Sequence, residues 1–233
     1  MGWGVSYIRI LFVPIRFIES WTLDSMNGIG VGRIVMKLIL GSQSANRKAV
    51  LERAGYVFDV MAADIDEKAV RHDDWYHMPL LIARAKAEAL LPRIQERALL
   101  ITADVVTIWN GDLREKPRDT AETRAFLTSF SKSPHPVECV NGLVVTDTGT
   151  RKRAEGTDVS KIWFGKIPDE LIATLIGEGK TCDYAGGFTL LDPRMYECVS
   201  KLEGSYESVL GMPLHLLRRL IEEVESEIRY KNL

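Results

Sequence analysis

The stretch Leu38-Ile39-Leu40-Gly41-Ser42-Gln43-Ser44-Ala45-Asn46-Arg47-Lys48 decides how this chain begins to fold. An apolar run stops at a glycine, two serines follow, and basic residues lie one turn into an amphipathic segment. This order predicts a strand over 35–40, a tight loop, and a helix over 45–54 with Ser44 as its N-cap and Gly55 as its stop. The N–H groups at such a helix start, together with the helix dipole, favour an anion in the loop. An ordinary strand-to-helix connection would contain the same residues, so a function needs further signals.

Strand-like and helix-like segments alternate along the rest of the chain. The patterns predict strands over 57–62, 99–109, 137–146 and 157–164, and helices over 80–91, 120–130, 169–177 and 213–230. Hairpins are expected at Asn110-Gly111 and between 188–191 and 196–202 across Asp192-Pro193. Because some connections carry helices and others are hairpins, the fold is predicted to be α/β, with a mixed twisted sheet and flanking helices.

The overall composition is that of an ordinary globular protein, with 233 residues and a formal net charge of −2. No global field attracts nucleic acid or acidic membranes, so neither is expected as a partner. Three widely spaced cysteines, Cys139, Cys182 and Cys198, indicate a reducing, cytoplasmic compartment. Four scattered histidines argue against a histidine-bound zinc.

Residues 1–35 differ in composition from the rest of the chain, since they carry three arginines, two acids and no lysine. Their apolar runs are interrupted and fall short of the roughly 18 residues that a membrane-spanning helix needs. We interpret them as an N-terminal extension outside the fold and assign the domain to 36–233, with Met26 or Met36 as the working start. A myristoylation signal at Met1-Gly2 and an organellar targeting presequence remain open alternatives.

Asp104 lies inside the nearly continuous apolar run of 99–106, where a carboxylate is costly unless a cation or metal meets it. The plainer alternative is an aspartate at a strand end, paired with a local arginine. Lys86 falls on the apolar side of its predicted helix, where it either reaches to water or meets an anion. On another edge of that helix, Arg84 and Glu88 are expected to form an i,i+4 pair.

Two loop residues complete the set of charged candidates. Lys116 stands directly before Pro117, which restricts the backbone and aims the cation. Glu67 ends an acidic cluster after the second strand, and with Asp104 it could hold a divalent cation such as Mg²⁺ or Mn²⁺ through oxygen ligands. Solvated loop charges are the alternative for both. The candidates together suit metal-assisted attack of water on a polyphosphate, because they comprise two carboxylates, an arginine, two lysines and a serine-rich helix start.

The sequence resembles the Maf-like nucleotide pyrophosphatases over about 37–220. The family opening ASxSPRR appears as 41–47, its AxxKA helix as 83–87 and its ADTVV strand as 103–106, while Asp66-Glu67 and Lys116-Pro117 match two shorter motifs. The closing GSYxxVVGLPL is similar to 204–214. Each motif is short, but their shared order and spacing are specific.

The resemblance implies a homodimer with an active-site cleft between two lobes. It implies hydrolysis of a nucleoside triphosphate to the monophosphate and pyrophosphate with Mg²⁺ or a similar metal. The implied roles follow the matching motifs: Ser42, Arg47, Lys86 and Lys116 bind phosphate, Asp104 is the essential carboxylate, and Glu67 serves metal or water. The same residues stood out on physical grounds.

This chain departs from the family at two places that bear on activity or on substrate choice. The Pro-Arg pair of the opening is Ala45-Asn46, which removes one cation. Leu191 stands where the uridine- and thymidine-type members have glutamine, and leucine offers no hydrogen bond to a base. The phosphate chemistry is expected to be retained and the base preference to be broadened or shifted. A nucleotide-binding regulatory protein without efficient turnover and a pyrophosphatase for deaminated purine nucleotides are the alternatives.

Overall fold

A central mixed sheet carries the fold in the computed structural model, which describes residues 36–230, with side chains to residue 226. The expectations for residues 1–35 lie outside this described part. In its order along the chain, the structure contains β1 (Lys37–Leu40), α1 (Ala45–Arg53), β2 (Asp59–Val60), η1 (Glu67–Ala69), α2 (Met78–Leu90), η2 (Leu91–Arg93), β3 (Ala98–Trp109), β4 (Asp112–Arg114), α3 (Thr120–Phe130), β5 (Val137–Asp147), β6 (Arg153–Phe164), α4 (Asp169–Gly177), η3 (Thr181–Asp183), η4 (Ala185–Gly187), α5 (Pro193–Glu197), β7 (Val199–Glu203), α6 (Tyr206–Val209) and α7 (Leu214–Tyr230).

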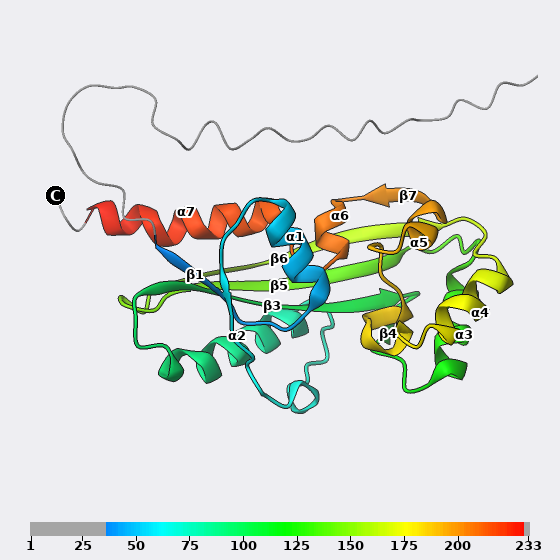
Figure 1. The fold of residues 1–233 in the computed structure, drawn as a ribbon, viewed down its shortest axis with the longest axis horizontal. Coiled ribbons are helices and arrows are strands. Elements are labelled where there is room, and N and C mark those ends of the chain that lie inside the picture. Colours follow the sequence, from blue (N-terminus) through cyan, green and yellow to red (C-terminus); the bar gives the residue numbers. More distant parts are fainter. Residues whose placement is uncertain (1–35, 231–233) are drawn as a thin grey trace, which may run out of the picture. The chain divides into compact units, whose positions relative to one another are not determined.

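The sheet has the order β2-β1-β3-β5-β6-β7, and β4 pairs with the far end of β3. Strands β1, β2 and β3 are parallel, whereas the other pairings are antiparallel. Figure 1 shows α2 below the sheet and α7 above it, with α3 and α4 gathered at the far end of the long strands. The predicted mixed α/β sheet with flanking helices is therefore confirmed.

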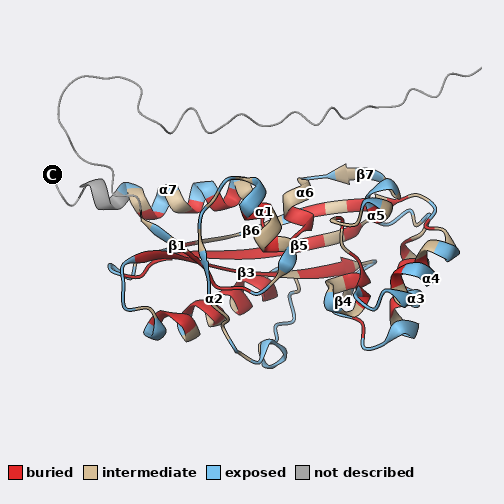
Figure 2. Ribbon diagram, viewed as in Figure 1, coloured by how far each residue is buried: buried red, intermediate tan, exposed pale blue. Residues whose placement is uncertain are grey.

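Both faces of the central strands are covered, so β3 and β5 are buried along almost their whole length (Figure 2). On the α2 side, Ala83, Ala87 and Leu90 pack with Leu100 and Val144. On the other side, a larger core includes side chains of α1 and α7. Fully burying one such leucine contributes about 1.5–3 kcal/mol, so these two layers hold the sheet between its helices.

Gly142 of β5 sets how closely α2 approaches the sheet. A Cβ atom at this position would lie 2.2 Å from the backbone nitrogen of Leu80, in the first turn of α2. Only glycine leaves room for this contact, and Gly142 is the register partner of Asp104 on β3. The same contact therefore fixes the height of α2 over the strand that carries Asp104.

Most predicted elements are present, but two elements and one ion pair differ from the predictions. Segment 57–62 forms only the two-residue strand β2. The expected hairpin of 188–191 with 196–202 is wrong: 193–197 is helix α5, capped by Asp192, and β7 pairs with β6 instead. The Arg84–Glu88 pair is also wrong, because Arg84 binds Glu155 and Glu88 binds Arg153 on β6.

Candidate active site

The predicted site residues gather at an opening in the edge of β3. Strand β1 pairs with β3 only as far as Ile101, and β4 pairs with it from Thr107 onward. Between these points the edge carries no neighbouring strand among the described residues. Asp104 lies in the middle of this opening, just beyond the carboxyl end of β1. Ligands of open α/β sheets bind at such carboxyl ends, where loops leave the sheet.

Asp104 and Lys86 form a buried ion pair across the α2 face of the sheet. The Lys86 ammonium lies 2.8 Å from Asp104 Oδ1 and 2.9 Å from Glu67 Oε1, and it donates to the Ala103 carbonyl at 3.3 Å. Lys86 and Asp104 are 5% and 7% exposed, whereas the Glu67 side chain is about half exposed. Lys86 therefore binds anions rather than reaching to water. Asp104 is paired with a lysine rather than with a local arginine.

Burial raises the pKa of Asp104, although the charges of Lys86 and Arg47 oppose the shift. Partial burial also acts to raise the pKa of Glu67, but Lys86, and then Arg47 and Lys116, outweigh it and hold that pKa below its ordinary value. The two carboxylates share one lysine and differ because Asp104 is deeper. In its ionised form, each carboxylate can accept a proton or a cation.

Arg47 reaches the site from the opposite face of the sheet. Its Nη1 donates to Ser42 Oγ at 3.0 Å, and its Nε donates to the Gly211 carbonyl at 3.0 Å. Ser42 Oγ also accepts the Ser44 backbone N–H at 3.2 Å, and Ser44 is the N-cap of α1, as predicted. Burial lowers the pKa of the Arg47 guanidinium, which still stays charged at neutral pH because its starting value is so high. Ser42 thus orients the arginine.

Lys116 lies on the exposed loop after β4, and its charge acts on Glu67. The structure therefore brings Glu67 and Asp104 together through Lys86, with Arg47 and Lys116 within electrostatic range. Ser42 is connected to this group of residues through its hydrogen bond with Arg47. The predicted roles of these six residues remain predictions, while their convergence is a property of the fold.

The carboxylates suit a hard cation. Within residues 36–226, no hydrogen bond is made to Asp104 Oδ2 or Glu67 Oε2, so each keeps one oxygen for a further partner. The same residues contain no cluster of three or more metal-binding side chains. Mg²⁺ commonly takes one or two protein carboxylates and completes its shell with water and substrate phosphates, so this donor set fits it.

Two contributions to the site were missed from the sequence. Gly211 supplies a carbonyl for Arg47 at a positive φ of 84°, and Thr189 donates to Asn46 Oδ1 at 3.0 Å. The closing motif that contains Gly211 was the available signal. Nothing in the sequence pairs Asn46 with Thr189, because they are far apart in the chain.

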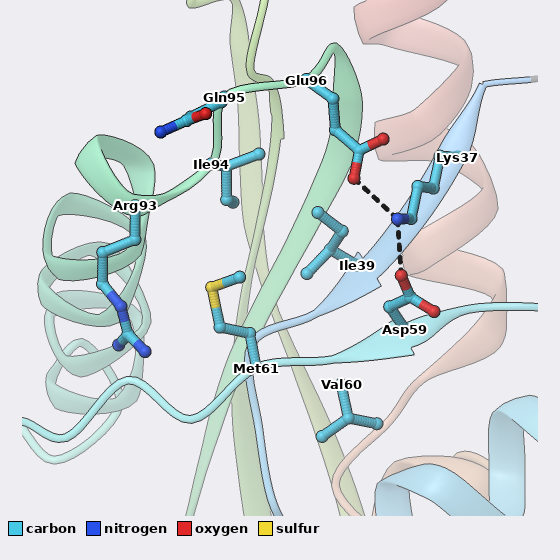
Figure 3. Close-up of a pocket in the computed structure, with 9 residues that line it drawn as sticks. All are labelled: Lys37, Ile39, Asp59, Val60, Met61, Arg93, Ile94, Gln95 and Glu96. Atoms are coloured by element: carbon cyan, nitrogen blue, oxygen red, sulfur yellow. Dashed lines mark hydrogen bonds and ion pairs between the residues drawn. The ribbon is translucent and has the colours of Figure 1, made fainter.

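A separate hollow of about 510 Å³ lies around Lys37, at the opposite end of β1 (Figure 3). The ammonium of Lys37 bridges Asp59 and Glu96 at 2.6 Å each, so its charge is already compensated. From Ala98, the partner of Lys37, to Asp104 the strand rises about 20 Å. None of the six candidate residues lines this hollow.

The fold and the site define a class of α/β proteins that gather cations and carboxylates at one sheet edge. A family model described as Maf-like protein matches residues 37–224. The chain belongs to this family, which confirms the resemblance seen in its motifs.

Three curated relatives cover most of the chain. One named 7-methyl-GTP pyrophosphatase, from Dictyostelium discoideum, is 43% identical over 80% of this chain and 96% of its own length. One named dTTP/UTP pyrophosphatase, from Vibrio vulnificus, is 32% identical over 80% of this chain and 98% of its own. One named nucleoside triphosphate pyrophosphatase, from Salinispora tropica, is 31% identical over 84% and 88%.

Proposed function

We propose that this protein hydrolyses nucleoside triphosphates to the monophosphate and pyrophosphate, with 7-methyl-GTP as the first substrate to test. The observation that carries the activity is the buried Asp104–Lys86 pair, joined by Glu67 and within range of Arg47. The substrate rests on the greater identity to the relative named for 7-methyl-GTP than to those named for dTTP/UTP. Leu191, in place of glutamine, fits a base other than uracil or thymine.

The protein's own groups divide the work between binding and proton transfer. Arg47, Lys86 and Lys116 neutralise phosphate oxygens and hold the triphosphate against the sheet edge. The ionised Asp104 carboxylate orients a water and accepts its proton as the water oxygen attacks the α-phosphorus. The bond from that phosphorus to the bridging oxygen breaks, and pyrophosphate leaves with the electron pair.

Asp104 and Glu67 would hold a divalent metal, Mg²⁺ or Mn²⁺, through their free oxygens. When bound, such an ion supplies positive charge that stabilises the developing negative charge on the phosphates. Metal dependence is part of the proposal and is supported by the oxygen-only donor set.

A homodimer and a cytoplasmic location complete the proposal. The homodimer rests on the family resemblance, and light scattering of the purified chain tests it. The location is supported by three free cysteines in the described part. Within residues 36–230, no helix combines the length and apolar character needed to cross a bilayer.

The decisive experiment incubates the full chain with 7-methyl-GTP, GTP, UTP, dTTP, CTP and ITP, each with Mg²⁺ or Mn²⁺, and measures pyrophosphate. In water labelled with oxygen-18, the label should enter the monophosphate. Release of inorganic phosphate with a diphosphate product would contradict cleavage at the α-phosphorus. Tight binding of nucleotide without turnover would instead favour the regulatory alternative, and a sharp preference for ITP would favour the deaminated-purine alternative.

A further inference from the structure

The short helix α6 is held against the sheet by a buried cluster of polar side chains. Ser208 of α6, Asn141 of β5 and Asp158 of β6 form this cluster, and Ser208 and Asn141 are fully buried. Asn141 Nδ2 donates to Ser208 Oγ and to the Ser208 carbonyl, at 3.0 Å each. The Ser208 hydroxyl donates in turn to Asp158 Oδ2. The polar cluster thus joins α6 to two neighbouring strands of the sheet (Figure 1).

The turn that ends α6 connects this cluster to Arg47. The Gly211 N–H donates to the Ser208 carbonyl at 2.9 Å, and the Met212 N–H donates to the Glu207 carbonyl at 2.9 Å. These two hydrogen bonds, with Gly211 at a φ of 84°, form a common helix-ending pattern. They turn the Gly211 carbonyl toward Arg47 Nε, which donates to it at 3.0 Å. The Ser208 carbonyl therefore accepts hydrogen bonds both from the buried amide of the cluster and from the residue that binds Arg47.

Close packing around Gly211 leaves little room for this turn to move independently. A Cβ atom at Gly211 would lie 3.2 Å from Val105 Cγ1 and 3.4 Å from Arg47 Nε. Val105 directly follows Asp104 on β3 and is the register partner of Asn141. Because protein interiors are packed without slack, a displacement of α6 would be transmitted to the guanidinium rather than absorbed. The polar cluster, the turn and the arginine form one continuous set of contacts.

The polar cluster is a costly way to fill the core. Within residues 36–226, the buried Oδ1 atom of Asn141 has no hydrogen-bond partner, and an unpaired buried acceptor lowers stability. An apolar side chain would avoid this loss, but it would not define one position for α6. Hydrogen bonds are directional, so the cluster specifies where Ser208 lies. Asp158 is fixed as well, because His215 Nε2 of α7 lies 2.9 Å from its Oδ1.

We propose that Asn141 and Ser208 are positioning residues that hold Arg47 in the orientation in which it binds a phosphate of the nucleotide. This inference rests on the proposed function, which assigns phosphate binding to Arg47. The guanidinium uses Nε on Gly211 and Nη1 on Ser42, so its other N–H groups keep a fixed direction. A shift of α6 would leave the charge of Arg47 in place. It would tilt the planar donor fork away from the phosphate oxygens.

The first test follows the Arg47 Nε–H by NMR spectroscopy in the full chain without nucleotide. Its resonance is assigned by its loss in Arg47→Lys, and its hydrogen exchange with solvent is then measured. Ser208→Ala should accelerate this exchange at least about threefold, as expected for residues of one network. Thr148→Val removes a buried hydroxyl with two hydrogen bonds beside the start of β3, so it should lower stability without changing this exchange. An unchanged exchange rate in Ser208→Ala would overturn the inference.

The second test measures, by calorimetry, the binding of a GTP analogue in which a methylene group replaces the α,β-bridging oxygen. Ser208→Ala should weaken binding at least about threefold. In an Arg47→Ala background the same change should cause no further loss, because no guanidinium remains to be positioned. Equal losses in both backgrounds would mean that the cluster acts apart from Arg47, and the inference would be wrong.

A second variant covers the case in which Ser208→Ala does not fold. Asp158→Ala removes the same hydrogen bond at a side chain that is 15% exposed and should reproduce both effects. Asp158→Asn keeps an acceptor oxygen and should behave as the wild type. A wild type that released pyrophosphate from no nucleotide would refute the proposed function. The exchange rate of the Arg47 Nε–H would still decide whether the cluster positions Arg47.

Discussion

Replacing Asp104 by asparagine should remove turnover while leaving the fold nearly as stable as before. The change keeps the shape of the side chain and an oxygen acceptor for Lys86, and it removes the charge that would take a proton from water. Loss of a general base lowers rates by about 10²–10⁴-fold, which corresponds to about 2.7–5.4 kcal/mol of transition-state stabilisation.

The small effect on stability follows from the direction of the pKa shift. Burial raises the pKa of Asp104 in the folded protein. Its contribution to stability is therefore greatest below the pKa of the unfolded chain and is lost as the pH rises through the folded pKa. Burial makes the ionised form less favourable here than in the unfolded chain, so asparagine does not lose a stabilising charge. Lys86 keeps Glu67 and the Ala103 carbonyl, and the free energy of unfolding should fall by no more than about 1 kcal/mol.

Asp147 provides the opposite case on the neighbouring strand. It is fully buried, and although burial acts to raise its pKa, Arg97 and the N–H groups of Gly149 and Thr150 hold that pKa below its ordinary value. Its contribution is present above the unfolded pKa and is lost as the pH falls through the folded one. Asp147→Asn should therefore cost about 1–3 kcal/mol of stability and leave turnover intact, because Asp147 pairs with Leu99 at the start of β3, away from Asp104.

The assay measures pyrophosphate release from pH 5 to 9, together with urea unfolding followed by tryptophan fluorescence. In the wild type, the acidic limb of kcat should lie above the ordinary aspartate pKa of about 3.9. An Asp104→Asn protein that kept more than half of its turnover would remove this carboxylate from the chemistry. One that was destabilised as much as Asp147→Asn would refute the reasoning about the buried charge.

Three further outcomes are expected. Lys116→Ala should weaken triphosphate binding more than monophosphate binding in calorimetry, because the lysine cation neutralises charge on the distal phosphates. Equal losses of affinity for both ligands would make Lys116 structural. Gly142→Ala should lower both the Tm and kcat, since its Cβ would overlap the Leu80 backbone, whereas Gly177→Ala, with open space around it, should change neither. Chelation by EDTA should stop pyrophosphate release and added Mg²⁺ or Mn²⁺ should restore it, whereas full activity in EDTA would exclude the proposed metal.

The sequence predicted the core of the fold because local patterns decide it. The apolar run of β3, the Asn110-Gly111 turn, with φ of 50° and 83°, and the Ser44 cap each follow from nearest neighbours along the chain. The predicted hairpin across Asp192-Pro193 was wrong because a proline that follows a capping aspartate starts a helix as readily as a turn. The predicted Arg84–Glu88 ion pair was wrong because β6 offers each side chain a better-placed partner.

The site was partly predictable for a related reason. Asp104 and Lys86 were conspicuous because a charge on an apolar face needs a partner, and they proved to be partners of one another. Contacts that depend on how distant segments approach left no local mark. Thr189 carries an ordinary polar side chain, and Gly142 is one glycine among 18.

The parallel pairing of β1 with β3 has a consequence for the order in which the protein folds. The β5–β6 hairpin closes over a short turn, whereas β1 must find β3 across the intervening chain that contains α1 and α2. Contacts between distant segments cost more loop entropy and form later. Ser42 and Arg47 follow β1 directly, so we expect the half of the site for which we propose phosphate binding to be assembled last. A nascent or partly unfolded chain would then hold its hydrophobic sheet together well before it could act on cellular nucleotides.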